Sequence, residues 1–397
     1  MIPDPSVVLG SFILLQNMTQ FFIIWLALLL PTTASATAVM PPCRTVFAAT
    51  VAGTAADAEK TQLLIQHGRH TLSYSLFQPG LDHFVSPHGL IAHEQQLRRR
   101  LVLGDPLASD SDTPAVLDAF LETHKDPFFC AITRHTAQHL SQRGFLVNEL
   151  GRDTRIHIPS YSLDGKDKTK LRQAYKKFLN SGYSVQEVSL VDGAPQSAME
   201  HITQKWRSGK AVSTREVRFL TRPIVYSHEM DVRKFMVLNP AQEMVGLYFF
   251  DPLYDQGKVT GYSLAFKRKL PATLTGLEEA VTVWAIQTFQ AEGRQWLNLG
   301  MTPLYKIEDT EFPHSKSLHH ALKAVLKYGD GLIYNFSGHS DFKHRYRGDE
   351  FPVYVATRHE WNIRSVLSMI KASGLRCPPK QFTSILCCLC RNLLSGK

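Results

Sequence analysis

Three stretches in the last third of the chain carry its strongest structural signal: RKLPATLTG (268–276), WLNLGMTPLY (296–305) and YNFSGHSDFKHRYRGDEFPVY (334–354). We interpret them as strands that lead into loops in which Arg, Lys, His and Tyr are concentrated. Such side chains are what a site for a phosphate-bearing or acyl-bearing substrate needs. We therefore expect the chemistry of this protein to lie in this part of the chain.

Elsewhere, apolar strand-like runs alternate with amphipathic helical runs, which is typical of sheets covered by helices and predicts an α+β fold. PFFCAI (127–132) has the composition of a buried strand, and Thr113-Pro114 is a good start for a helix that ends at Lys125. Further helices are predicted over 168–179, with Leu171, Tyr175, Phe178 and Leu179 on its apolar face, from a capping box at Thr275–Glu278 to Glu292, and over 317–328.

A chain of 397 residues exceeds one ordinary core, so we expect two lobes and terminal appendages. We place the first lobe at 50–190 and the second at 191–360, followed by a C-terminal helix and a Cys-rich apolar tail at 361–397. A short echo, LVLGDPL (101–107) against LNLGMTPL (297–304), would suit two copies of one lobe.

Residues 1–40 hold a hydrophobic segment and the start of a linker. The span from Val7 to Leu30 is long enough to cross a hydrocarbon core of about 30 Å. It contains no Lys or Arg, and basic residues begin only at Arg44, so we favour an uncleaved anchor in the inner membrane with the globular part in the cytoplasm. The small residues around Ala36 and Ala38 also fit signal-peptidase cleavage, and the alternative is a secreted or periplasmic protein.

The 44 Lys and Arg residues outnumber the 35 Asp and Glu residues, which gives a net charge of +9. This balance favours contact with tRNA or an anionic membrane, although a basic surface without a ligand fits as well. The six cysteines do not indicate a disulfide framework. Cys387, Cys388 and Cys390 lack a second ligand pair nearby, so we interpret them as part of an apolar tail and predict no metal site.

Motifs for other chemistries are missing from the sequence. It has no HExxH, Walker loop, G-x-S-x-G or paired C-x-x-C, and no pyrophosphate loop for coenzyme A. The 17 histidines, including His319-His320, show no standard ligand spacing, so structural roles are favoured for them. We predict no cofactor and no DNA partner.

Together with GFLVNELGRDTRIHIPSYSLDGKDKTKLRQAYKK (144–177), the three stretches quoted above resemble the C-terminal synthase domain of the phosphatidylglycerol lysyltransferases, over roughly residues 95–358. The resemblance implies two tandem acetyltransferase-like (GNAT-like) lobes. It also implies a membrane-associated aminoacyltransferase that moves an aminoacyl group from aminoacyl-tRNA, its co-substrate, to a phospholipid such as phosphatidylglycerol.

The resemblance suggests three catalytic residues. Arg268 stands eight residues before Gly276, as does the Arg of the family's D-L-M-R strand, whereas Ala265 occupies the position of the Asp. That acid is thought to bind the amino group of a charged donor, so its loss bears on lysine as the donor. Lys343 and Arg345 match the basic positions of the family's Y-K-x-K-F motif, and two alternating cations on a strand would attract a phosphate.

Five further residues are candidates for substrate binding. Asp153 matches one acid of the family's G-E-E-A, and Lys166 and Arg172 match its S-L-x-G-K and L-R. Trp206 matches the Trp of its E-W-L-x-x-K, and Asn298 lies in the middle of the three stretches, WLNLGMTPLY. As a lone aromatic residue, Trp206 also fits simple core packing.

Other functions stay open. Loss of the family acids at Ala265 and Arg152 also fits a non-catalytic descendant that binds lipid or RNA. A cleaved N-terminus would indicate an exported acyltransferase with a different donor, because tRNA is absent outside the cytoplasm. Purely structural alternatives are a salt bridge for Arg268 and a solvated edge strand for Lys343 and Arg345.

Overall fold

The computed structural model describes residues 55–188, 196–209, 218–329, 335–360, 368–369 and 371–373. The predicted hydrophobic segment at the N-terminus and the cysteines of the C-terminal tail lie outside these residues. Among the helices that the structure describes, none combines the length and the apolar character needed to cross a membrane.

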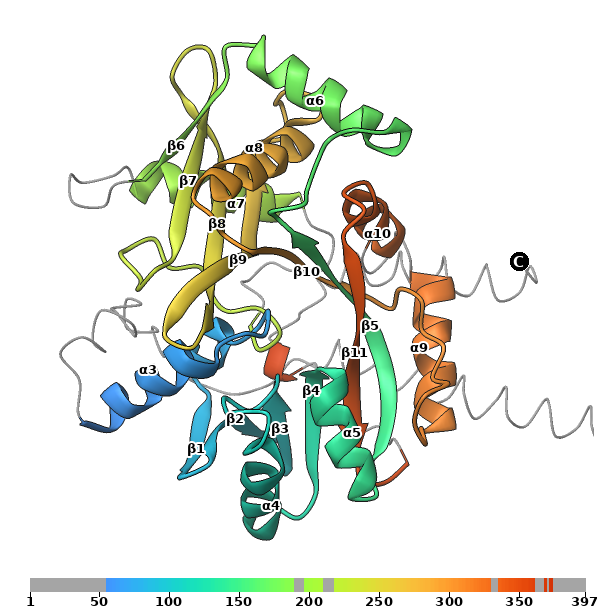
Figure 1. Cartoon of the computed structure of the whole chain (residues 1–397). Helices are drawn as coiled ribbons and strands as arrows, with labels where there is room; N and C mark the ends of the chain where they lie inside the picture. The colour runs from blue at the N-terminus through green and yellow to red at the C-terminus, as the bar shows by residue number, and fades with distance from the viewer. Residues whose placement is uncertain are drawn as a thin grey trace, which may run out of the picture.

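One eleven-stranded mixed sheet runs through the molecule in the order β1-β2-β3-β4-β11-β5-β10-β9-β8-β7-β6 (Figure 1). The strands are β1 (Asp82–Ser86), β2 (Gly89–Gln96), β3 (Arg99–Leu103), β4 (Pro127–Ile132), β5 (Leu146–His157), β6 (Ser184–Glu187), β7 (Arg233–Leu238), β8 (Met244–Asp255), β9 (Lys258–Lys269), β10 (Trp296–Pro303) and β11 (Asp349–Thr357). The helices are α3 (Ala55–His67), η1 (Tyr74–Phe77), α4 (Thr113–Thr123), α5 (Arg134–Gln142), η2 (Lys166–Lys168), α6 (Thr169–Leu179), α7 (Gln196–Ser208), α8 (Leu277–Ala291), α9 (Lys316–Gly329) and α10 (Phe336–His344). The predicted α+β class is confirmed.

The two halves of the sheet share one plan and exchange strands. Each half contains antiparallel strands, a helix and then a strand that pairs in parallel, as β3–α4–β4 and β9–α8–β10. β5 follows β4 in the chain but pairs with β10, whereas β11 follows β10 and pairs with β4. β5 and β11 also pair with each other, antiparallel, at the centre of the sheet. The predicted lobes at 50–190 and 191–360 therefore share a continuous sheet, and their independence as domains stays a prediction.

The echo between LVLGDPL and LNLGMTPL does not mark equivalent strands. Its first copy begins in β3, before the crossover helix of its half, whereas its second copy lies in β10, after the crossover helix. Both are buried strands that meet a glycine with positive φ, +65° at Gly104 and +78° at Gly300. Similar local requirements explain the likeness without equivalence in the fold.

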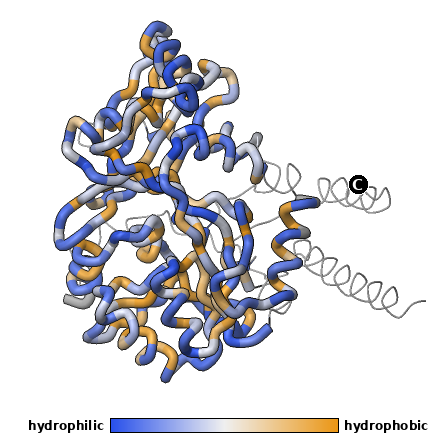
Figure 2. The backbone as a smooth tube through the Cα atoms, turned by 45° about the vertical axis from the view of Figure 1, so that its right-hand side comes forward, coloured by the Kyte–Doolittle hydropathy of each residue, from blue (hydrophilic) through white to orange (hydrophobic). Residues whose placement is uncertain are grey.

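Helices cover both faces of the sheet in each half (Figures 1 and 2). In the second half, α6 and α8 pack on one face and α7 on the other. In the first half, α4 and α5 cover one face, while α3 and η1 cover the other. As predicted, α8 lies centrally, and it buries eight of its side chains. The two halves thus have separate apolar cores on a shared sheet.

Two predictions about helix ends are wrong. The N-cap of α8 is Gly276, with φ +84°, instead of Thr275. Glu278 contacts Lys267 of β9 at 2.5 Å, so a tertiary ion pair replaces the expected capping box. At the end of α6, Leu179 is 59% exposed because the helix ends beyond the edge of the core that Leu171 and Phe178 enter.

The stretch around Lys343 is also not a strand. Asn335 caps α10 by accepting a hydrogen bond from the Gly338 backbone N–H at 2.9 Å, and the helix continues to His344. An Asn cap starts a helix because it satisfies a free N–H of the first turn. Lys343 and Arg345 therefore do not alternate along a strand, and their side chains reach different partners.

A buried group of four charges joins the loop before β7 to the sheet. Arg222 donates to both oxygens of Asp251, at 2.7 and 2.9 Å, and to Glu229 at 2.7 Å. Lys234 contacts the other oxygen of Glu229 at 2.7 Å. All four side chains are almost fully buried, and the Tyr74 ring of η1 lies 5.1 Å from the Arg222 guanidinium. The group is charge-balanced, which offsets the desolvation of its members.

We predict that Glu229→Gln lowers the free energy of unfolding by about 3–5 kcal/mol, because two buried cations would then share one carboxylate. Urea unfolding followed by circular dichroism measures the change. Asp110→Asn is the control, since Asp110 forms an exposed pair with Arg69 and should change stability by less than about 1 kcal/mol. Equal small effects for both variants would contradict a structural role for the group.

Candidate functional site

The two parallel strands of the second half separate at their carboxyl ends. β9 and β10 pair only from Gly261 to Ser263 and from Trp296 to Asn298. Beyond Asn298, β10 has a bulge before Met301 and continues beside β5, while β9 continues beside β8. Ligand sites in such sheets lie at the carboxyl ends of parallel strands, where neighbouring strands diverge.

Lys343 of α10 reaches this point of divergence. Its Nζ donates to the carbonyl oxygen of Gly300 in the bulge, at 2.6 Å, and the side chain is 3% exposed. The pKa of Lys343 is lowered to about 7, mainly by burial; the Asp153 carboxylate opposes this shift, and Lys267 contributes to it. The residue is therefore a buried amine that can change its charge near neutral pH.

A chain of hydrogen bonds lies beside Lys343 on β5 and β10. The Arg155 Nε donates to Asn298 Oδ1 at 3.1 Å, and Asn298 Nδ2 donates to Thr71 Oγ1 at 2.8 Å. Thr71 Oγ1 in turn donates to Asp153 Oδ2. The other oxygen of Asp153, Oδ1, is buried and accepts no hydrogen bond from any residue that the structure describes. The site thus contains one buried carboxylate oxygen without a described donor.

Strand alternation explains why these side chains meet. Asp153 and Arg155 are two apart on β5 and share a face. Asn298 is the direct partner of Arg155 on β10, and Phe351 is the partner of Asp153 on β11. Thr71, from the turn between α3 and η1, covers this face. The structure therefore brings together three predicted site residues, Asp153, Asn298 and Lys343.

Arg268 and Trp206 form a separate pair. Arg268 follows Lys267 on β9, so their side chains leave opposite faces of the strand, and its guanidinium lies 5.0 Å from the Trp206 ring of α7. A register shift in β9 falls between Leu264 and Phe266, which leaves Ala265 packed on the same α7 side as Phe266. Arg268 is 3% exposed. The family's D-L-M-R positions therefore meet the helix that carries Trp206.

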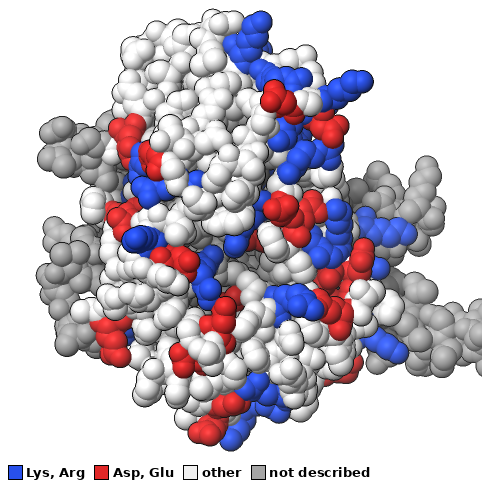
Figure 3. Space-filling view, in the orientation of Figure 1, with Lys and Arg blue, Asp and Glu red and all other residues white. Residues whose placement is uncertain are grey.

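The remaining predicted cations lie at other places. Arg345 pairs with Glu279 at the start of α8. Arg172 donates to the carbonyl oxygens of Leu163 and Gly165, both at 2.6 Å, and so braces the turn before its own helix. Lys166 is exposed beside that turn. In the space-filling view, Lys and Arg atoms gather around α6 at the upper right, whereas the rest of this face mixes both signs (Figure 3).

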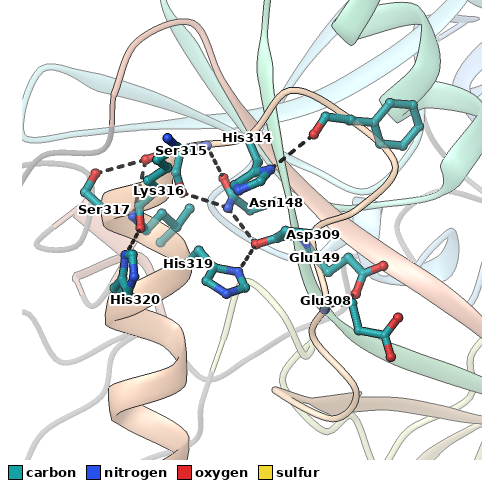
Figure 4. A network of polar contacts seen from close by, with 12 residues as sticks. Asn148, Glu149, Glu308, Asp309, His314, Ser315, Lys316, Ser317, His319 and His320 are labelled. Carbon is teal, nitrogen blue, oxygen red and sulfur yellow. Dashed lines mark hydrogen bonds and ion pairs between the residues drawn. The ribbon is translucent and has the colours of Figure 1, made fainter.

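The histidines near α9 have structural partners (Figure 4). Asp309 Oδ2 contacts His319 Nδ1 at 2.7 Å and accepts from Asn148 Nδ2 at 2.8 Å. Asn148 also donates to the Ser315 carbonyl at 3.0 Å, so the network fastens the start of α9 to β5. In the part of the chain that the structure describes, no group of His, Cys, Asp and Glu is arranged to hold a metal ion.

Comparison with known proteins identifies the family. Residues 61–357 match the family model described as phosphatidylglycerol lysyltransferase, C-terminal. The chain belongs to this family. The predicted resemblance is thereby confirmed, and the match includes both halves of the sheet.

Individual relatives agree with this assignment. A phosphatidylglycerol lysyltransferase of Bacillus subtilis is 25% identical over 330 residues, which cover 80% of this chain but 37% of that protein. The chain thus corresponds to well under half the length of this relative. Among solved structures, L-PGS from Bacillus licheniformis has a TM-score of 0.67 at 20% identity, covering 80% of this chain and 96% of its own.

A second solved structure shares the fold. It is the C-terminal domain of an Agrobacterium fabrum protein named for lysylphosphatidylglycerol synthetase, with a TM-score of 0.66 at 18% identity. The likeness covers 80% of this chain and 98% of that domain. At these identities the two structures show that the fold is shared across the family.

Two site residues escaped the sequence analysis. Arg155 stands two residues after Asp153, so the alternation of polar residues at this spacing was a usable signal for it. Thr71 had no such signal, because 82 residues separate it from Asp153 and only the tertiary fold joins them.

We predict that Asp153→Asn moves the pKa of Lys343 below its value of about 7, because a neutral amide no longer stabilises the ammonium form. The titration of lysine side-chain NMR signals, with Lys343 assigned by substitution, measures the shift. Asp167→Asn is the matched control, since Asp167 is an exposed residue of η2 and its substitution should leave this pKa unchanged. An unchanged or raised Lys343 pKa in Asp153→Asn would contradict the coupling.

Proposed function

We propose that this protein is a lipid aminoacyltransferase that moves an aminoacyl group from aminoacyl-tRNA to a hydroxyl of a phospholipid, with phosphatidylglycerol as the first candidate. Membership of the phosphatidylglycerol lysyltransferase family supports this proposal. The matches of Arg268, Lys343 and Arg345 to family motifs support it at the level of residues. The enzyme would act at the cytoplasmic side of the inner membrane, where charged tRNA is available.

The observation that carries the proposal is the buried Lys343 amine next to Asp153. An amine with a pKa of about 7 is partly neutral at physiological pH and can act as a general base. In the proposed reaction it accepts the proton of the lipid hydroxyl as that oxygen attacks the ester carbonyl of the donor. A new ester bond forms to the lipid oxygen, the bond to the tRNA ribose oxygen breaks, and the proton passes to this leaving oxygen.

Arg268 is proposed to hold negative charge of the donor. Its guanidinium is a fixed fork of donors, and the aromatic rings of Trp206 and Phe266 hold it at 5.0 and 5.2 Å. Catalysis would then rest on positioning and on cationic stabilisation, without a covalent intermediate on the protein.

We predict that turnover rises with pH through about 7 and then levels, because only the neutral Lys343 amine accepts a proton. Lys343→Met should lower turnover by roughly 10²–10⁴-fold and remove this step of the profile. Transfer of a radiolabelled aminoacyl group from charged tRNA to extracted lipid, followed from pH 5.5 to 9, measures both effects.

Lys177→Met, on the exposed face of α6, is the control for loss of a lysine and should keep the wild-type profile. An active Lys343→Met with an unchanged pH profile would assign Lys343 a structural role. If folded protein moves no aminoacyl group from a full set of charged tRNAs to any lipid, the non-catalytic binding alternative replaces the proposed function.

We predict that Ala265→Asp shifts donor preference towards cationic aminoacyl groups, because a carboxylate on this face of β9 would pair with a lysyl or arginyl side chain or an α-ammonium group. Competition among a complete set of charged tRNAs, read by the mass of the lipid product, measures the preference. Ala265→Asn has nearly the same shape without the charge and should leave the ranking unchanged. If the Asp and Asn variants rank the charged tRNAs in the same order, position 265 does not determine the choice of donor.

A further inference from the structure

Arg155 is a half-buried cation, and only one of its nitrogen atoms, Nε, donates a hydrogen bond to a described residue. Its guanidinium lies between two rings on neighbouring strands, 5.4 Å from Trp296 of β10 and 5.5 Å from Phe351 of β11. The Nε donates to Asn298, which fixes the plane of the group. No described residue accepts from Nη1 or Nη2. The two rings therefore orient a fork of donors that has no anion of its own.

Its electrostatic surroundings favour an additional anion. Burial lowers the pKa of Arg155, Asp153 raises it and Arg69 lowers it, so among the described residues Asp153 is the carboxylate that stabilises its charge. Asp153 also stabilises the charge on Lys343. Asp153 is thus shared with Lys343, while Arg69 adds positive charge, so the Arg155 fork keeps the capacity to bind a singly charged ligand.

Next to this fork lies the unused acceptor of the site, Asp153 Oδ1. Residues two apart on one strand face are roughly 7 Å apart, twice the rise per residue. The pair Asp153 and Arg155 therefore offers one acceptor and one anion-binding fork at the length of a small headgroup. A glycerol phosphodiester has this pattern, since a three-carbon chain joins its phosphate to a terminal hydroxyl.

We propose that Arg155 binds the phosphodiester of the acceptor lipid, while Asp153 Oδ1 accepts a hydrogen bond from one of the two headgroup hydroxyls and thereby places the other, the attacking one, beside Lys343. This assignment rests on the proposed function and names the recognition of its acceptor. Phe351, which is 47% exposed, provides apolar surface at the rim for the rest of the lipid. Arg155 is thus a specificity residue for an anionic phosphodiester lipid.

The charges around the fork favour a lipid headgroup over an RNA strand. Asp349 is the direct strand partner of Arg155, on the same face of the sheet, and is exposed. A polyanion that followed this surface would meet this carboxylate after its first phosphate. A phosphodiester with a single charge needs only the fork, and its uncharged remainder can lie on Phe351.

The test measures binding without any donor. Dihexanoylphosphatidylglycerol, kept below its micelle concentration, is titrated into the full chain by calorimetry. We expect Arg155→Gln to raise the Kd for this lipid by roughly ten- to a hundredfold. Arg155→Lys should raise it less, because a lysine keeps the charge and loses the fork. Arg134→Gln is the matched control, because Arg134 is exposed on α5, and should bind like the wild type. Thermal melts confirm that each variant is folded.

A second lipid tests the hydroxyl contact. Dihexanoylphosphatidylmethanol has the phosphodiester but no headgroup hydroxyl, so the wild type should bind it more weakly than the phosphatidylglycerol analogue. Asp153→Asn should reduce the difference in affinity between the two lipids, while Arg155→Gln should weaken the binding of both to a similar extent. An RNA acceptor-stem probe should bind Arg155→Gln as it binds the wild type.

Unchanged lipid affinity in folded Arg155→Gln would overturn the assignment, as would a loss confined to the RNA probe. The proposed function fails in a different way. If the protein binds the lipid through Arg155 but transfers no aminoacyl group, the assignment of this site holds and the proposed enzymatic function is wrong. If Arg155→Gln transfers the group with an unchanged KM for the lipid, the enzymatic function holds and the assignment of this site is wrong.

Discussion

The pairing of β5 with β11 is the constraint on which the rest of the molecule depends. Each of these strands comes from one half of the chain and completes the sheet of the other half. Their own antiparallel ladder then joins the two exchanged strands over most of their length. Backbone N–H and C=O groups at the centre of a sheet are costly to leave without hydrogen-bond partners. Each half therefore needs a strand of the other half to pair its edge strand.

This arrangement also explains where the polar groups gather. β5 lies between β10 and β11, so its side chains have neighbours on one strand from each half of the sheet. One face of β5 supplies Asp153 and Arg155, and the neighbouring strands add Asn298 and Phe351 on the same face. Further along β5, Asn148 fastens the start of α9 through Asp309. A single strand thus organises both the candidate site and the anchoring of a distant helix.

The sequence predicted the elements better than it predicted their contacts. The strand at 127–132 and the helices near 113–125 and 317–328 were correct, because their apolar periods and end signals are local. The helix around Lys343 was mistaken for a strand, because the residues of this short polar stretch favour neither conformation. The Asn335 cap, which is seen only in the structure, starts the helix. For the site, motif matches indicated Asp153 and Lys343, but matching could not show that Arg345 would pair with Glu279 on another helix.

By itself, the sequence determined the family, the α+β class and the residue types available for chemistry, because these depend on composition, period and motif spacing. Only the tertiary structure decided the electrostatics of the site. A lysine has an ordinary pKa in an extended chain, and it changes when folding removes water from Lys343 and brings Asp153 close to it. In the same way, Arg155 becomes an oriented donor fork only when three strands from two exchanged halves place Trp296, Asn298 and Phe351 around it.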